Sequence, residues 1–266
     1  MSLPVAVLAI QVAAAAVPAL SASEQRYLDA RIAANARFAN ADPADIEPNR
    51  VLIQLTSRLR EIIGPVSLAG IDGPGKAAYD GFEGVGSTEM ADGLSFDWQG
   101  SHLFVTTRAL FARTAAATRP TPDRTVDEAL LTFTVFTDAA YMAFADVPVR
   151  HGSSIELARA SVGLVAQDIG AWPPDTLVVQ VLRGDRVYMV GTSLSPRLEQ
   201  VPTCEAKCGR CRDQAAFDAY RRCVGAVLPT RPSFAAVVRR AQAMVDALQA
   251  EEPPRLTPER QQSTPK

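Results

Sequence analysis

A run of strand-forming residues followed by every cysteine of the chain constrains its fold most. Residues 176–182 read Thr-Leu-Val-Val-Gln-Val-Leu, and residues 187–192 read Val-Tyr-Met-Val-Gly-Thr. β-Branched and aromatic residues of this kind favour strands. The residues between them include Gly184-Asp185, a common two-residue hairpin turn. We therefore predict a β-hairpin, and with it an antiparallel sheet that leads into the cysteine-bearing segment.

A second hairpin is predicted upstream. Residues 94–98 alternate apolar and polar side chains, Gln99-Gly100 supplies a turn, and residues 102–107 return. Two further strands are predicted, at residues 66–68 and 130–137, the second from its β-branched and aromatic residues.

Helices are predicted where apolar residues recur every three to four positions or where capping residues occur. Ser153 and Glu156 have the spacing of a capping box, which predicts a helix after them, and Ser233 is a candidate N-cap of the last helix. The predicted helices span residues 24–38, 50–63, 108–117, 155–167, 213–227 and 233–250.

These elements predict an α+β fold in which antiparallel hairpins pack against helices from both ends of the chain. We expect a single domain over residues 23–250, with a disulfide-stapled C-terminal helical region. Residues 251–266 are polar and contain four prolines, which predicts a disordered tail.

The first 22 residues resemble a secretory signal peptide. Residues 3–20 are apolar apart from Gln11, no acid or base precedes Glu24, and Ala19, Ser21 and Ala22 are small residues where a signal peptidase could cut. A basic segment at the start is missing, so a membrane anchor, a buried core segment or a misplaced start remain alternatives. A cleaved signal over residues 1–22 predicts a periplasmic or secreted protein with no stable membrane span. Three lysines among 27 basic residues, together with the abundant alanine, indicate a bacterial source.

Four cysteines lie within twenty residues: Cys204, Cys208, Cys211 and Cys223. In an oxidising compartment, an even number of clustered cysteines indicates disulfides, here two, with three possible connectivities. The pairing favoured is Cys204 with Cys223 and Cys208 with Cys211. The first bridge would tie the end of the sheet to the helix that follows.

The same cysteines permit other chemistry. Four thiolates could hold zinc in a reducing compartment, which would make this a cytosolic zinc protein. Cys208 and Cys211 have the spacing of a thioredoxin-type redox pair, without the βαβ pattern that usually surrounds one. The spacing of the first three cysteines is similar to that of radical S-adenosylmethionine enzymes, although Arg210 replaces the usual aromatic residue.

Residues 66–77 resemble a Walker A loop, because Gly70 is followed after four residues by Gly75-Lys76. Ala77 stands where a Ser or Thr would bind Mg²⁺, and further glycines interrupt the helix that should follow. We therefore expect a structured loop with no cofactor. The acidic residues around it lack EF-hand spacing, so they favour turns over a calcium site.

Only two histidines, His102 and His151, could serve as a catalytic base. No Gly-x-Ser-x-Gly elbow occurs, but a hydrolase using His151 with Asp138 or Asp146 remains possible, because triad members can be distant in sequence.

The sequence therefore favours an exported soluble protein that binds a small molecule or an envelope protein. The alternatives are a periplasmic hydrolase and a thiol-disulfide oxidoreductase. A net charge of −2 gives no reason to expect nucleic-acid binding.

Overall fold

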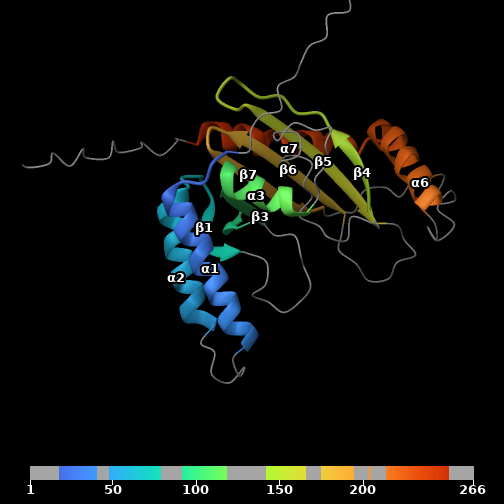
Figure 1. Cartoon of the computed structure of the whole chain (residues 1–266). Helices are drawn as coiled ribbons and strands as arrows, with labels where there is room; N and C mark the ends of the chain where they lie inside the picture. The colour runs from blue at the N-terminus through green and yellow to red at the C-terminus, as the bar shows by residue number, and fades with distance from the viewer. Residues whose placement is uncertain are drawn as a thin grey trace, which may run out of the picture.

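A seven-stranded antiparallel sheet forms the centre of the protein (Figure 1). The computed structural model describes residues 18–40, 48–78, 92–118, 142–165, 175–194, 204 and 214–251. Strand order across the sheet is β1-β2-β3-β7-β6-β5-β4. The strands are β1 (Ile71–Ala78), β2 (Gly93–Trp98), β3 (Ser101–Thr107), β4 (Met142–Val147), β5 (Leu157–Val165), β6 (Thr176–Arg183) and β7 (Arg186–Ser193).

Helices cover both faces of this sheet, so the predicted α+β class is confirmed. In Figure 1 α3 lies in front of the strands and α7 behind them, while α1 and α2 pair at the β1 side and α6 lies by β4. The helices are α1 (Ala22–Asn40), α2 (Pro48–Ile63), α3 (Arg108–Thr118), α6 (Gln214–Val227), the short 3₁₀ helix η4 (Leu228–Thr230) and α7 (Phe234–Ala250).

Both predicted hairpins are confirmed, and each has a tight two-residue turn. Between β2 and β3, Gln99 and Gly100 both have positive φ (50° and 70°), as a type I′ turn requires. Between β6 and β7, Gly184 has φ 58° and Asp185 does not have positive φ, which is the pattern of a type II′ turn. Turns of these types match the strand twist, so they determine the register of β2–β3 and β6–β7.

The helix predicted over residues 155–167 is wrong, because residues 157–165 of this segment form strand β5 in the interior of the sheet. β5 pairs with β4 on one side and β6 on the other. Ala160 and Val162 are buried and Arg159 is exposed, an alternation of period two. Glu156 does not close a capping box with Ser153, since it forms an ion pair with Arg108. Sheet pairing on both sides therefore outweighs a local capping signal.

The glycine-rich segment also differs from its prediction. Residues 66–68 form no strand, whereas Gly73, Gly75 and Lys76 lie inside β1, paired with β2. Lys76 stands opposite Ser95 in the ladder and is exposed. A phosphate-binding loop needs a strand, a turn and then a helix. Here an edge strand, β1, takes the place of that turn. The resemblance to a P-loop is therefore wrong, and so is the structured loop that we predicted in its place.

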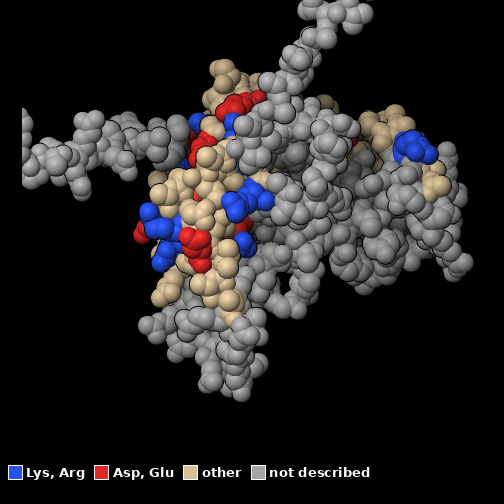
Figure 2. All heavy atoms as spheres, in the orientation of Figure 1, with Lys and Arg blue, Asp and Glu red and all other residues tan. Residues whose placement is uncertain are grey.

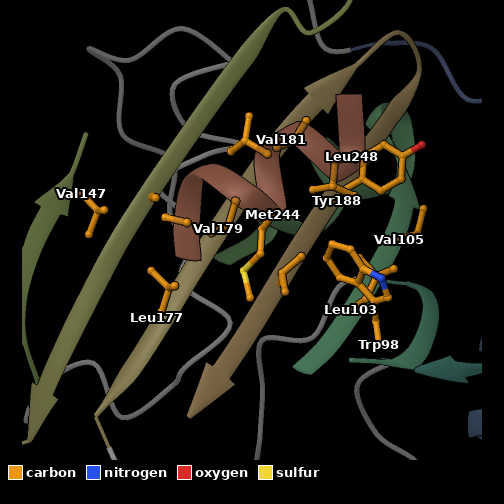
Figure 3. Packing of buried hydrophobic residues seen from close by; sticks show 14 of the residues in the cluster. Trp98, Leu103, Val105, Val147, Leu177, Val179, Val181, Tyr188, Met244 and Leu248 are labelled. Atoms are coloured by element: carbon orange, nitrogen blue, oxygen red, sulfur yellow. The ribbon is translucent and has the colours of Figure 1, made fainter. Parts of the chain in front are cut away.

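The main hydrophobic core lies between the sheet and helices α1, α2, α6 and α7. Figure 3 shows side chains from α7 and from β2, β3, β4, β6 and β7 meeting in this layer. The last predicted helix is confirmed as α7, and its buried side chains are Phe234, Val237, Ala241, Met244, Val245 and Leu248. Val238, which the apolar pattern also predicts to be buried, is only partly buried. A smaller cluster on the opposite face packs α3 against the sheet through Phe104, Phe111, Ala112, Leu182, Val187 and Met189.

Helix starts were predicted less well than helix interiors. Ser233 precedes α7 as predicted, but its side chain makes no capping hydrogen bond. The capping box lies instead at α1, where Ser21 Oγ accepts from the Glu24 amide and the Glu24 carboxylate accepts from the Ser21 amide. Ser21 falls inside the segment assigned to the signal peptide, and Leu20 packs against the core.

The remaining sequence predictions lie partly outside the described residues. These are the strand at 130–137, most of the signal segment, the tail beyond Glu251, and Cys208 and Cys211. Glu251, assigned to the disordered tail, is buried and paired with Arg186, so the ordered fold includes at least this residue.

Two phenylalanine rings lie over glycines of the neighbouring strand, and both pairs help to hold the β1 side of the sheet. Phe104 of β3 covers Gly93 of β2, and Phe96 of β2 covers Gly75 of β1. A Cβ atom at either glycine would overlap the ring above it.

We expect Gly93→Ala to destabilise the protein by about 1–3 kcal/mol, because the new methyl would overlap Phe104 and lie 2.6 Å from the Val105 carbonyl oxygen. The backbone oxygen cannot move aside as a side chain can. Urea unfolding of the variant and wild type measures the loss. Adding Gly93→Ala to a Phe104→Leu variant should cost less stability than adding it to the wild type, because the ring is gone. Some loss should persist, because the carbonyl oxygen of Val105 is still there. A stability equal to wild type for Gly93→Ala alone would show that this close packing is not present.

Candidate functional site

The Cys204–Cys223 disulfide is present, as the sequence predicted. Its Cα atoms are 5.4 Å apart, and it links the buried Cys204, which follows the sheet in the chain, to α6. Cys204 and Cys223 are bonded to each other in this structure and so are not thiolates that could bind zinc. The bridge between Cys208 and Cys211 remains a prediction, since both lie outside the described residues.

His151 does not meet a described acidic partner. Its ring nitrogen Nδ1 lies 3.1 Å from the carbonyl oxygen of Gly152, its own neighbour, and the side chain is exposed. Asp146 is exposed on β4, where it pairs in register with Ser161. Asp138 lies outside the described residues. In the described structure, the predicted His151–Asp146 pair is therefore not assembled.

His102 has a serine partner that sequence reasoning missed. Its Nε2 lies 3.1 Å from Ser95 Oγ, and Asp97 stands directly opposite His102 in the β2–β3 ladder. The predicted hairpin turn could have revealed this, because it places residues 95, 97 and 102 on one face. His102 and Asp97 are exposed, and the described structure contains no ion pair between them. An unoriented, exposed Ser–His contact is an ordinary cross-strand pair.

The acidic residues of the glycine-rich segment are dispersed where they are described. Asp72 and Asp97 face each other across β1 and β2 and are exposed. Asp92 is buried and accepts a hydrogen bond from Tyr27 at 2.9 Å, with Arg31 at 3.3 Å. Within the described ranges no group of three His, Cys, Asp or Glu side chains could hold a metal ion.

The most extensive buried polar cluster surrounds Arg186 on β7. Its guanidinium lies 3.3 Å from Glu251 Oε1 and donates to the backbone oxygens of Ile63, at the end of α2, and of Pro65. Ser67 donates its amide to the same Glu251 oxygen at 3.1 Å. The side chain of Arg186 is 9% exposed and that of Glu251 is fully buried. This cluster joins α2, β7 and the end of α7, and it serves the fold.

Two titratable groups near this cluster have raised pKa values. Burial, followed by the interaction with Glu251, raises the pKa of Tyr188 well above its ordinary value. Burial, followed by the charge of Glu24, raises the pKa of Asp185 in the β6–β7 turn, although Arg108 and Arg186 oppose this. Neither group lines a described hollow, so we assign neither a catalytic role.

A small hollow of about 110 Å³ lies between the β2–β3 turn and α7. Sheet residues form one side of it, and helix residues form the other. Its walls are Trp98, Gln99 and Ser101 from the sheet and Arg240, Ala243, Met244 and Ala247 from α7. Figure 3 shows Trp98 and Met244 reaching into the layer between the sheet and α7. Sequence reasoning missed this site because its residues come from segments that are distant along the chain.

The polar groups of this hollow are held in place by their neighbours. Arg240 Nη2 donates to the buried Thr192 hydroxyl at 2.7 Å. No carboxylate among the described residues forms an ion pair with Arg240. The Trp98 indole N–H donates to the Ala69 carbonyl at 2.9 Å, and Gln99 donates to the same oxygen at 3.2 Å. The hollow is therefore a small, partly apolar site with one available positive charge.

Charges elsewhere on the described surface are mixed. Figure 2 shows acidic and basic side chains interspersed over the α1–α2 side of the molecule. Ile32 on α1 and Ile53 on α2 are large apolar residues that remain exposed.

None of the described helices has the length and apolar character needed to cross a bilayer. Relatives offer no further guide to the site. No family model matches the chain, and neither curated proteins nor solved structures show a significant similarity to it.

Proposed function

We propose that this is an exported soluble protein that acts by binding, in the periplasm or outside the cell. The observation that carries this proposal is the Cys204–Cys223 disulfide. Structural disulfides persist in oxidising compartments and are rare in the cytosol of mesophiles. The apolar, uncharged start of the chain supports the same conclusion.

Binding is favoured over hydrolysis by the placement of the histidines. Among the described residues, the hydrogen-bond partner of His151 is the Gly152 carbonyl, and His102 is exposed beside Ser95. The described polar groups that converge on a hollow are Arg240, Ser101 and Gln99, which suit recognition of a ligand. A thiol-disulfide oxidoreductase would depend on Cys208 and Cys211 and remains the alternative.

The proposal predicts a specific mass for the mature protein. We would express the full chain with its native N-terminus and measure its intact mass after thiol alkylation, with and without prior reduction. We expect loss of a segment ending near residue 22 and no alkylated cysteine until the protein is reduced. A cut before Ser21 would retain the capping box of α1, and a cut after Ala22 would remove it.

An uncut chain with alkylated Cys204 and Cys223 would refute export. A control chain with Arg replacing Ala9 in the apolar segment should stay uncut, because a charge in that segment blocks a signal peptide. If Cys208 and Cys211 alone are alkylated in the exported wild type, the redox alternative gains support.

A further inference from the structure

We propose that the hollow beside Arg240 binds the carboxylate of a small aliphatic acid. This rests on the proposed binding function and names its ligand class. The site lies between the β2–β3 turn and the middle of α7. It combines one cation, one hydroxyl and apolar walls. These three features restrict the charge, the hydrogen-bonding groups and the size of a ligand that could bind.

The cation is Arg240, which is hydrogen-bonded to the sheet. Its hydrogen bond to Thr192 at 2.7 Å uses one N–H group of the guanidinium. Thr192 is buried on β7, so this contact orients the arginine over the sheet. Most of the five donors of a guanidinium remain, and their forked arrangement matches a carboxylate. Because Arg240 has no described acidic partner, its charge is available to an anion.

The neighbouring polar group is Ser101, at the start of β3. Ser101 is 6% exposed and lines the same hollow. The structure shows no hydrogen bond from the Ser101 hydroxyl to a described residue. A hydroxyl beside a guanidinium can donate to the second oxygen of a bound carboxylate. The Trp98 indole N–H is already used by Ala69, so that ring offers a wall and not a donor.

The size and apolar walls favour a short acid over a phosphate. A cavity of about 150 Å³ accommodates benzene, so about 110 Å³ suits a ligand of four to six non-hydrogen atoms. Trp98, Met244 and Ala247 provide apolar contacts for an alkyl group. A phosphate would bring more charge than one arginine neutralises and would leave these walls without contacts.

The test uses propionate and the oxidised wild-type protein. The chain has two tryptophans, and the indole N–H signal of Trp98 in a ¹H–¹⁵N NMR spectrum reports on the wall of the hollow. A Trp172→Phe variant assigns that signal. We expect propionate, at constant ionic strength, to shift it saturably with half-saturation at millimolar concentration, since so small a ligand has few atoms to contribute affinity.

Matched variants isolate the charge. Arg240→Gln should weaken binding about tenfold or more, because it removes a charged hydrogen-bond donor. Arg239→Gln, an exposed neighbour on α7, should bind as wild type does. Propionamide, which is neutral and of the same shape, should bind at least tenfold more weakly than propionate. Phosphate should produce no saturable shift.

A carboxylate can be a free acid or the end of a peptide, and N-acetylglycine tests the second source. It is larger than the ligands that fit within the hollow, so its acetyl end would have to lie outside. Binding of N-acetylglycine as tight as that of propionate would indicate recognition of a chain terminus. No saturable shift with either acid, equal binding of propionamide, or an unchanged Arg240→Gln variant would each overturn the inference. The intact-mass measurement decides export independently, so the two proposals fail separately.

Discussion

Arg186→Met is expected to lower the free energy of unfolding by about 3–5 kcal/mol, the largest effect of any single substitution considered for this protein. The methionine removes the partner of Glu251, whose side chain is fully buried, and leaves that charge uncompensated. It also leaves the carbonyl oxygens of Ile63 and Pro65 without the guanidinium that donates to them. Urea unfolding measured by circular dichroism gives the difference.

Arg183→Met is the matched control for this prediction. Arg183 lies on the neighbouring strand and donates to the Leu248 carbonyl at the end of α7, but it is only half-buried and no described carboxylate pairs with it. We expect its replacement to cost no more than about 1.5 kcal/mol, the contribution of one hydrogen bond. The double variant Arg186→Met/Glu251→Leu should recover part of the loss, because no unpaired charge remains buried.

Truncation tests the same cluster from the other side. A chain that ends at Ala250 lacks Glu251 and should lose stability comparable to that of Arg186→Met, because the arginine is then buried without its partner. A chain that ends at Pro253 keeps Glu251 and should match the full-length protein. If Arg186→Met or the Ala250 truncation costs less than about 1 kcal/mol, the cluster does not hold α2, β7 and α7 together.

Replacing Cys204 or Cys223 with serine is expected to lower the free energy of unfolding by about 3 kcal/mol in oxidising buffer. The bridge closes a loop with a sequence separation of 19 residues, and a closed loop of this length restricts the unfolded chain by about that amount. Cys204 is also fully buried in the main core, so the serine places a hydroxyl among apolar side chains. Thermal and urea unfolding measure the loss.

Reduction distinguishes the bridge from the packing of the sulfur atoms. In reducing buffer the free energy of unfolding of the wild type should fall close to that of Cys223→Ser. Position 223 is only partly buried, so the serine itself costs little. The double variant Cys204→Ala/Cys223→Ala should resemble the reduced wild type in both buffers. An equal difference between wild type and Cys223→Ser with and without reductant would contradict the bridge as the source of stability.

The sequence by itself determined the elements whose signals are local. Turn residues at 99–100 and the alternation beside them predicted the first hairpin, and turn residues at 184–185 between runs of β-branched and aromatic residues predicted the second. Apolar stripes of period 3.6 predicted α2 and α7. The pairing of Cys204 with Cys223 followed from clustering and from the placement of the two cysteines at the end of the sheet and in the next helix. Each of these features depends on residues that are close in sequence, at most about twenty positions apart.

Tertiary structure decided the identity of the segments with mixed signals. Residues 157–165 carry a capping pattern at their start, yet they complete hydrogen bonding between β4 and β6 as β5. Residues 66–77 resemble a phosphate loop, yet Phe96 covers Gly75 and residues 71–78 extend the sheet as β1. In both cases backbone pairing and burial contributed by distant strands outweigh local propensity.

The candidate site was decided by tertiary structure alone. Ser101 and Arg240 line the same hollow only because α7 packs across the sheet, and Arg186 meets Glu251 only because the chain after α7 returns to β7. Neither pair leaves a periodic or short-range pattern in the sequence. Local spacing can reveal turns, stripes and disulfides, whereas the position of a lone charge depends on which surfaces the folded chain brings together.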